Sequence, residues 1–235
     1  MTTRLQSLFF VLIAAIALGS CFVDDPGPRQ ETERQYSVVD FDRLEMGSGL
    51  HIDVVYGNFF SVKARGDRRN IDDLVVRTEG STLVIDYRNF RERRHDTFIE
   101  ITMPELHAVT FSGGSDSRVG GFSSAGGFDV YLSGGSVCQL NLDAHKLKAV
   151  LSGASYLKAG GTADELYADV SGASAFKAFN LPVATCTLLI SGASDGEVTV
   201  TDVLQVTATG ASHVVYRGNP SVSTEVSGSS SVHAE

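Results

Sequence analysis

The segment Leu151–Gly160 reads LSGASYLKAG, and the tetrapeptide SGAS inside it decides the fold because the chain repeats it. Related tetrapeptides begin at seven positions, which are Ser112, Ser133, Ser152, Ser171, Ser191, Thr209 and Ser227. Successive copies lie 18 to 21 residues apart. Such a period is too short for repeats built from helix pairs, and it fits one coil of a β-solenoid.

Apolar and polar side chains alternate on both sides of each tetrapeptide. The residues one, three and five positions before it are mostly apolar, and those two and four positions before it are mixed or polar. Apolar residues return five and seven positions after its first residue. A period of two is that of a strand with one buried face. Each coil is therefore predicted to consist of a strand, a corner, a second strand and a loop, with the tetrapeptide at the corner.

Glycine occupies the second position of every tetrapeptide. The seven residues are Gly113, Gly134, Gly153, Gly172, Gly192, Gly210 and Gly228. Because glycine permits positive φ and close backbone approach, we predict that these residues are structural corner glycines. The flanking hydroxyls can bond to backbone groups that the bend leaves unpaired. In a stack they would form two columns of Ser and Thr, about 4.8 Å apart per coil.

These features predict an all-β fold, a right-handed parallel β-helix over residues 105–235. A single coil could not fold alone, because burying five apolar side chains contributes roughly 7–15 kcal/mol and ordering about 19 residues costs at least as much. Stacking solves this, since each coil completes the hydrogen bonds and core of its neighbour. Residues 36–104 lack the tetrapeptide but contain five strand-like segments and a turn at Glu79-Gly80. We expect them to form earlier coils or an N-terminal cap.

The N-terminus predicts export and a lipid anchor. Residues 1–20 contain Arg4 and an apolar run from Leu8 to Leu18, which has the length of a signal peptide and is too short to span a bilayer. The following Gly19-Ser20-Cys21 is similar to a bacterial lipobox, so Cys21 is the predicted lipidation site. An ordinary signal peptide is the alternative. Residues 21–35 are predicted to be a flexible linker, and the protein an outer membrane lipoprotein that faces the periplasm or the cell surface.

The two remaining cysteines are predicted to be free and to face inward. Cys138 and Cys186 belong to the second and fifth copies of the repeat. Three coil spacings separate them by roughly 14 Å, whereas a disulfide needs Cα atoms within about 7 Å.

Composition and spacing argue against most kinds of chemistry. A formal net charge of −9 disfavours a nucleic-acid partner. Seven similar corners do not suit a serine nucleophile, which needs one special environment with a base in reach. Asp116 and Asp195 follow corners four coils apart, about 19 Å, too far for paired glycosidase carboxylates. Asp143 and Asp164 could be close but are interpreted as loop acids. We therefore predict no catalysis, no metal and no cofactor.

Two surface features remain. Tyr131, Tyr156 and Tyr167 belong to successive coils and point outward, so they are a tentative binding wall for sugar rings or a protein. The alternative is that tyrosine simply favours strands. The arginine-rich segment RNFRERRHD at 88–96 is interpreted as a solvated loop between strands.

The segments FDRLEMGSGLHIDVVYGNFFSVKARGD (41–67) and ITMPELHAVTFSGGSD (101–116), with the serial SGAS corners, resemble the head GIN domain family of autotransporter-adhesin-like proteins. The resemblance extends from about Tyr36 to the C-terminus. It implies a secreted or envelope-attached β-helical protein of Gram-negative bacteria, and it supplies no catalytic residues. A lipid anchor departs from the autotransporter architecture.

The predicted function is that of a non-catalytic, adhesin-like or ligand-binding lipoprotein of the cell envelope. Its expected partners are the membrane, through the anchor, and surface glycans or envelope proteins. A β-helical enzyme acting on polysaccharide and a structural or regulatory envelope component remain as alternatives. No cap is evident after the last repeat, so self-association through that end is also expected.

Overall fold

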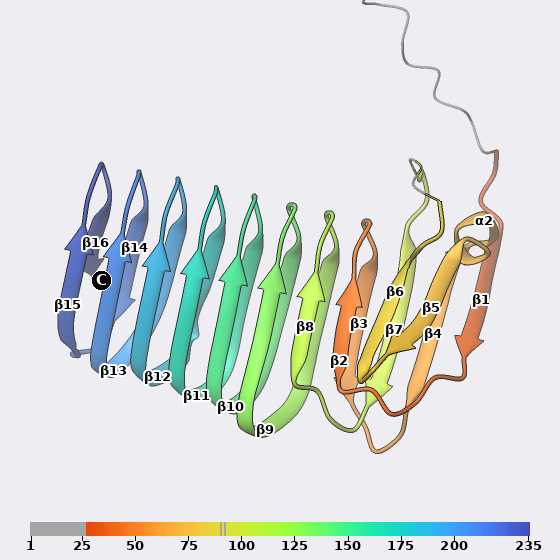
Figure 1. Cartoon of the computed structure of the whole chain (residues 1–235), viewed down its shortest axis with the longest axis horizontal. Coiled ribbons are helices and arrows are strands. Elements are labelled where there is room, and N and C mark those ends of the chain that lie inside the picture. Colours follow the sequence, from red (N-terminus) through yellow and green to blue (C-terminus); the bar gives the residue numbers. More distant parts are fainter. Residues whose placement is uncertain (1–26, 90, 92) are drawn as a thin grey trace, which may run out of the picture.

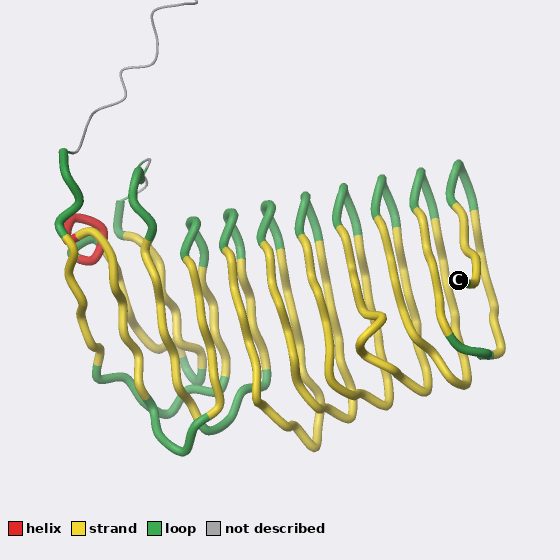
Figure 2. The backbone as a smooth tube through the Cα atoms, turned by 180° about the vertical axis from the view of Figure 1, so that it is seen from behind, coloured by secondary structure: helices red, strands yellow, loops and turns green. Residues whose placement is uncertain are grey.

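The predicted coils stack in register. A computed structural model describes residues 27–89, 91 and 93–235 of the chain. Five long strands, β9 (Asp116–Leu132), β10 (Val137–Leu151), β11 (Tyr156–Val170), β12 (Ala175–Ile190) and β13 (Asp195–Ala208), pair in parallel one after another. Each runs from one corner to the next and bends halfway, so that the corners form one row along the stack (Figures 1 and 2). The predicted β-solenoid is therefore confirmed.

Buried and outward side chains alternate along each strand, and the buried ones fill the interior of the solenoid. Cys138, Leu157 and Phe176 are register partners on three successive strands, and all three are buried. The polar residues beside them point outward. The prediction of two free, inward-facing cysteines is confirmed, because Cys138 and Cys186 are both buried and unpaired. Burial raises the pKa of the Cys138 thiol to about 11 and that of Cys186 to about 12.

The corners have the backbone that the sequence predicts. All seven corner glycines have positive φ, between 62° and 83°. From the fourth corner onward the coils also approach closely, since a Cβ on Gly172 would lie within 3.2 Å of three backbone atoms of Gly153. The amide of Ala173 donates to the carbonyl of that same Gly153 at 2.8 Å. The hydrogen-bond ladder thus continues through the bend, and only glycine fits there.

The fourth residue of the tetrapeptide forms the buried column of hydroxyls. Its members are Ser115, Ser136, Ser155, Ser174, Ser194 and Ser212. Each Oγ donates to the carbonyl of the first residue of its own tetrapeptide, at 2.6–2.9 Å. Ser174 Oγ also accepts from the amide of Ser155 in the preceding coil, at 3.2 Å. The first residue of each of the first six tetrapeptides is only half-buried, and Ser227 of the seventh is exposed.

Residues 36–104 contribute both further coils and a cap. β2 (Arg43–Met46) and β3 (His51–Tyr56) form a coil that pairs in parallel with β8 (Ala108–Phe111) and β9. Its corner is Gly47-Ser48-Gly49, in which Ser48 has a φ of 62° in the place of the corner glycine. On its other side lie β6 (Thr82–Tyr87) and β7 (Thr97–Met103), also parallel to it. The coils therefore do not stack in chain order at this end.

Antiparallel strands close the N-terminal end. β5 (Leu74–Glu79) pairs with β6, and Gly80, at φ 60°, turns the chain between them as predicted. β4 (Ser61–Asp67) pairs with β7, and β1 (Glu31–Tyr36) covers β4. The short helix α2 (Arg68–Ile71) begins after Asp67, whose carboxylate accepts from the amide of Arg69. Because β1 begins at Glu31, the predicted linker 21–35 is too long.

The strands at the opposite, C-terminal end of the stack are short and mostly exposed. β14 (His213–Arg217), β15 (Ser221–Val226) and β16 (Ser231–Ala234) form the last layers, and every residue of β15 is exposed. The predicted signal peptide and Cys21 lie outside the described residues. Within the part of the chain that the structure describes, no helix is long and apolar enough to cross a membrane.

Candidate functional site

Each coil presents two outward walls. We call the outward face of the strand segments that follow a corner the post-corner wall, and the face of the segments that precede a corner the pre-corner wall. Tyr131 and Tyr167 lie on the pre-corner wall, where Lys148 stands between their strands and places its Nζ 5.5 Å from the centre of the Tyr131 ring. Tyr156 lies on the post-corner wall beside Val137. The three tyrosines therefore do not form one surface, and the prediction of a single tyrosine wall is wrong in that respect.

Two parallel rows of side chains run along the post-corner wall. Register partners in the middle row are, in order, Lys63, Glu100, Asp53, Arg118, Gln139, Lys158, Lys177 and Glu197. Register partners in the lower row are Val55, Gly120, Asn141, Gly160 and Asn180. Because the glycines carry no side chain, the lower row has gaps on either side of Asn141.

These gaps form a hollow with a volume of about 560 Å³. Its floor includes Gly120 and Gly160, and Asn141 and Asn180 line its lower side. Arg118, Gln139 and Lys158 line it along the middle row. The hollow thus combines apolar floor with amide and cationic side chains, the composition of many ligand sites.

A second hollow, of about 280 Å³, continues the first toward the cap. The two share Arg118 and Gln139. Together they form one groove along the post-corner wall, over β7, β3, β9, β10 and β11, and we refer to it as the groove. Its cap-proximal end is acidic, with Asp53, Glu100 and Asp116 among its lining residues.

An aromatic stack borders the acidic end. The Arg65 guanidinium lies 4.8 Å from the centre of the Phe98 ring, and Phe98 stacks on His51 with 5.0 Å between ring centres. His51 lies 3.6 Å from Asp96 and 3.9 Å from Asp116. Asp116 therefore has a histidine neighbour and is four strands away from Asp195 in the register, as the repeat predicts.

The basic part of the groove contains two cations that have no acidic partner in the described chain. Lys177 pairs with Glu197 at 2.9 Å. Among residues 27–89, 91 and 93–235, neither Arg118 nor Lys158 has an acidic partner within 4.0 Å, and both are exposed. Two free cations, two strands apart on a chain with net charge −9, mark this part of the groove as suited to an electronegative ligand.

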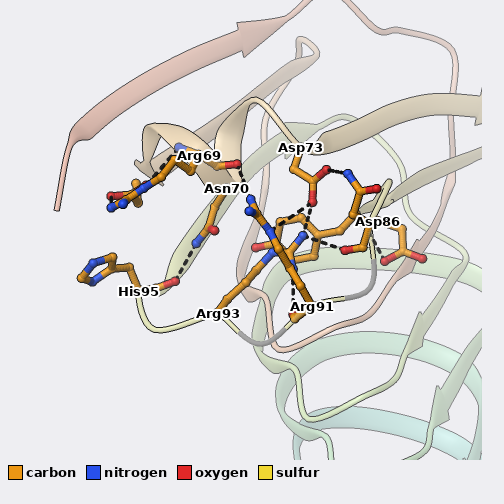
Figure 3. Close-up of polar contacts among 10 residues, drawn as sticks. Arg69, Asn70, Asp73, Asp86, Arg91, Arg93 and His95 are labelled. Carbon is orange, nitrogen blue, oxygen red and sulfur yellow. Dashed lines mark hydrogen bonds and ion pairs between the residues drawn. The ribbon is translucent and has the colours of Figure 1, made fainter. Parts of the chain in front are cut away.

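Described residues of the arginine-rich segment 88–96 hold this segment against the cap and do not line the groove (Figure 3). These residues lie between β6 and β7, where the other coils have a tight corner, and contact residues of the cap. Arg93 is paired with Asp73 and lies 3.5 Å from the centre of the Tyr87 ring, with a side chain only 10% exposed. Asn89 donates to the same Asp73 at 2.5 Å, and Asn70 donates to the carbonyl of His95 at 2.8 Å. The described residues of the segment lie between strands as predicted, but the side chain of Arg93 is largely covered rather than solvated.

No constellation of a nucleophile with base and orienting acid is assembled in the part described. The corner serines bond to backbone carbonyls. The His213 ring nitrogen Nδ1 lies 2.6 Å from Ser231 Oγ, but this pair is exposed and, in the described chain, no carboxylate lies within 4.0 Å of the His213 ring. Asp143 and Asp164 bind Thr162 and His145, respectively, as surface groups. Likewise, no group of three or more metal-ligating side chains occurs among the described residues.

Fold and groove together define a capped parallel β-solenoid with an extended polar groove on one wall. The chain belongs to the family described as "Putative auto-transporter adhesin, head GIN domain", whose model matches residues 40–220. This confirms the resemblance seen in the sequence, and it places the chain among adhesin-like proteins.

Solved structures share the fold. A putative adhesin from Bacteroides fragilis NCTC 9343 is 19% identical with a TM-score of 0.80, over 88% of this chain and 98% of that one. A putative adhesin from Parabacteroides distasonis ATCC 8503 is 17% identical with a TM-score of 0.72, over 89% and 98%. A putative lipid binding protein from the same strain is 18% identical with a TM-score of 0.68, over 87% and 96%. No curated protein matches the chain.

Proposed function

We propose that this protein is a non-catalytic, adhesin-like component of the cell envelope that binds a polysaccharide along the groove. The observation that carries the proposal is the groove itself, which crosses successive coils and presents amide side chains from β10 and β12. Gln139, Asn141 and Asn180 each offer both donors and acceptors, which suits the hydroxyl groups of a sugar chain. An extended groove on a rigid stack suits an extended polymer better than a compact ligand.

Glycan-array binding of the mature chain carrying Cys21→Ala tests this proposal. The variant Asn141→Ala/Asn180→Ala should lose binding, because it removes hydrogen-bonding groups from the lower side of the groove. The variant Tyr131→Ala/Tyr167→Ala alters the pre-corner wall and should bind normally. If the tyrosine variant alone lost binding, the ligand would lie on the pre-corner wall and the groove would not be the site.

The location of the protein is part of the proposal. Export by residues 1–20 and acylation of Cys21 would attach the solenoid to the outer membrane, on its periplasmic or surface side. Family membership supports an envelope location. Labelling of cells with radioactive palmitate should mark the wild-type protein and leave Cys21→Ala unlabelled, and equal labelling of the two would contradict the anchor.

Self-association through β15 is a further expectation of the proposal. Val222 and Val226 of this strand are 40% and 46% exposed, and one edge of the strand has no partner in the described chain. Exposed strand edges favour pairing with another chain. Gel filtration of the Cys21→Ala protein at micromolar concentration should show a dimer or larger species, and a monomer would end this idea.

The acidic end of the groove favours one alternative, an enzyme acting on polysaccharide. Asp53 and Glu100 are register partners there, with His51 and Asp116 nearby, and paired carboxylates about 5–9.5 Å apart serve in glycoside hydrolysis. Such an enzyme would release oligosaccharides, and Asp53→Asn or Glu100→Gln would abolish the release. The binding proposal expects the polysaccharide to be recovered intact. A purely structural envelope protein would bind no glycan and would be identified by its partners in a membrane pull-down.

A further inference from the structure

We propose that the polysaccharide is acidic, and that its carboxylate or sulfate groups bind Arg118 and Lys158. This inference rests on the proposed function and adds the chemical class of the ligand. It follows from three features of the groove, which are two unpaired cations, their spacing, and the acidic residues at one end.

The first feature is the absence of internal partners. Acidic residues outnumber basic ones in this chain by 28 to 19, and most exposed cations that the structure describes are paired with them. Arg118 faces Asp53 across the register without reaching it, and Lys158 stands between Gln139 and Lys177. The fold therefore does not use these two charges in ion pairs, and both remain available to a ligand.

The second feature is the spacing of the two cations. Arg118 and Lys158 lie on β9 and β11, with Gln139 of β10 between them. Two coil spacings separate their backbones by about 10 Å. The guanidinium matches a carboxylate or sulfate with two parallel hydrogen bonds, and the ammonium acts as a compact point charge. A polymer with repeated anionic groups could contact both cations while its hydroxyls contact the amides between them.

The third feature is the opposite charge at the cap-proximal end of the groove. Asp53, Glu100 and Asp116 line that end and would repel an anionic polymer. The ligand should therefore occupy the groove over β9, β10 and β11, and removal of the nearby acidic charges should strengthen binding.

The experiment measures the affinity of the mature Cys21→Ala chain for polygalacturonate, dextran sulfate and neutral dextran by affinity electrophoresis at low salt. Wild type should bind the two acidic polymers and not dextran. Arg118→Gln/Lys158→Gln should lower that affinity about tenfold or more, because two charge-assisted contacts are lost. Polygalacturonate carries carboxylates and dextran sulfate carries sulfates, so their ratio identifies the preferred group.

Two further variants control for charge. Lys146→Gln/Lys148→Gln removes the same charge from the pre-corner wall and should change the affinity less than twofold. Asp53→Asn/Glu100→Gln should raise it. Arg118 and Lys158 are both exposed, so the thermal midpoint of Arg118→Gln/Lys158→Gln should equal that of wild type. This measurement separates loss of folding from loss of binding.

The outcomes distinguish this inference from the function on which it rests. Binding of dextran as tight as that of the acidic polymers, with no effect of Arg118→Gln/Lys158→Gln, would overturn the acidic ligand and leave a glycan-binding groove. Equal losses in the groove and pre-corner variants would show non-specific attraction and would also overturn it. Absence of binding to all three polymers would overturn the acidic ligand, and absence of binding on the glycan array as well would refute the function on which it rests.

Discussion

The corner at Gly172 offers a direct test of why the repeat has glycine at its second position. The substitution Gly172→Ala introduces a Cβ at a φ of 81°, where an L-residue is strained by about 1–2 kcal/mol. The same Cβ would also lie within 3.2 Å of the amide nitrogen, carbonyl carbon and oxygen of Gly153. Ordinary contacts between carbon atoms are about 3.5–4.0 Å, so the two coils must separate locally.

This separation should break the 2.8 Å hydrogen bond from Ala173 to Gly153, and leaving such backbone groups unsatisfied costs about 1–3 kcal/mol. The total expected loss is therefore about 2–5 kcal/mol. Gly135→Ala is the matched control, because Gly135 has a φ of 86° but a Cβ added there would have no other atom within 4 Å. It should lose only the strain energy, about 1–2 kcal/mol.

Equilibrium unfolding in urea, followed by far-ultraviolet circular dichroism, measures both variants. Thermal midpoints provide a second measure, with about 2–4 °C expected per kcal/mol for a chain of this size. If Gly172→Ala were no less stable than Gly135→Ala, close approach of the coils would not be the reason for glycine, and positive φ alone would explain the repeat.

Three further predictions concern buried groups. Ser174→Ala should destabilise the protein by about 1–3 kcal/mol in urea unfolding, because it removes a buried hydroxyl that bonds to Ser171 and to the amide of Ser155; a loss below about 0.5 kcal/mol, the usual scale of surface changes, would contradict this. Cys138 and Cys186 should not react with a thiol reagent at pH 8 until denaturant is added, because burial raises the pKa of both thiols; rapid reaction of the native protein would show that the interior is open. Hydrogen bonds from Arg69 lower the pKa of Asp67, so Asp67 should stabilise the fold above its unfolded pKa of about 4 and lose this effect as the pH falls below it. Asp67→Asn should therefore narrow the stability difference between pH 7 and pH 3, and an unchanged difference would be evidence against the contribution.

The repeated part of the fold could be predicted because the backbone conformation at each corner, and the burial of the residues around it, depend on nearby residues. Each corner needs positive φ, and glycine provides it wherever the corner occurs. The inward positions follow from alternation about that corner, as for Cys138 and Leu157. The coil formed by β2 and β3 does not match the repeat in sequence, since its corner has Ser48 where the others have glycine. Its position between β6 and β8 depends on pairing between distant strands, which no local pattern specifies.

The candidate site was only partly predictable. Tyr156 follows its corner, whereas Tyr131 and Tyr167 precede theirs, so the sequence contained the signal that places them on different walls. The outward position of Arg118 and Lys158 was also evident from alternation. The gap between Asn141 and Asn180 could not be predicted from alternation. A register shift after Lys158 changes which residue of the next coil pairs with Gly160. That alignment became visible only in the paired strands.

The glycines on the floor of the groove show that part of this sequence is not explained by folding. Neither Gly120 nor Gly160 has positive φ, and a Cβ on either would meet only ordinary contacts of 3.5 Å or more. Glycine inside a strand costs roughly 0.5–1 kcal/mol relative to alanine, so Gly120→Ala/Gly160→Ala should stabilise the protein by about 1–2 kcal/mol. The two methyl groups would also occupy the floor of the groove, and the variant should bind polygalacturonate several-fold more weakly. Gly161→Ala, at a φ of 106° and in contact with the carbonyl of Leu142, should instead destabilise the fold. A variant at 120 and 160 that was more stable and bound as tightly as wild type would show that the hollow is not where the ligand lies.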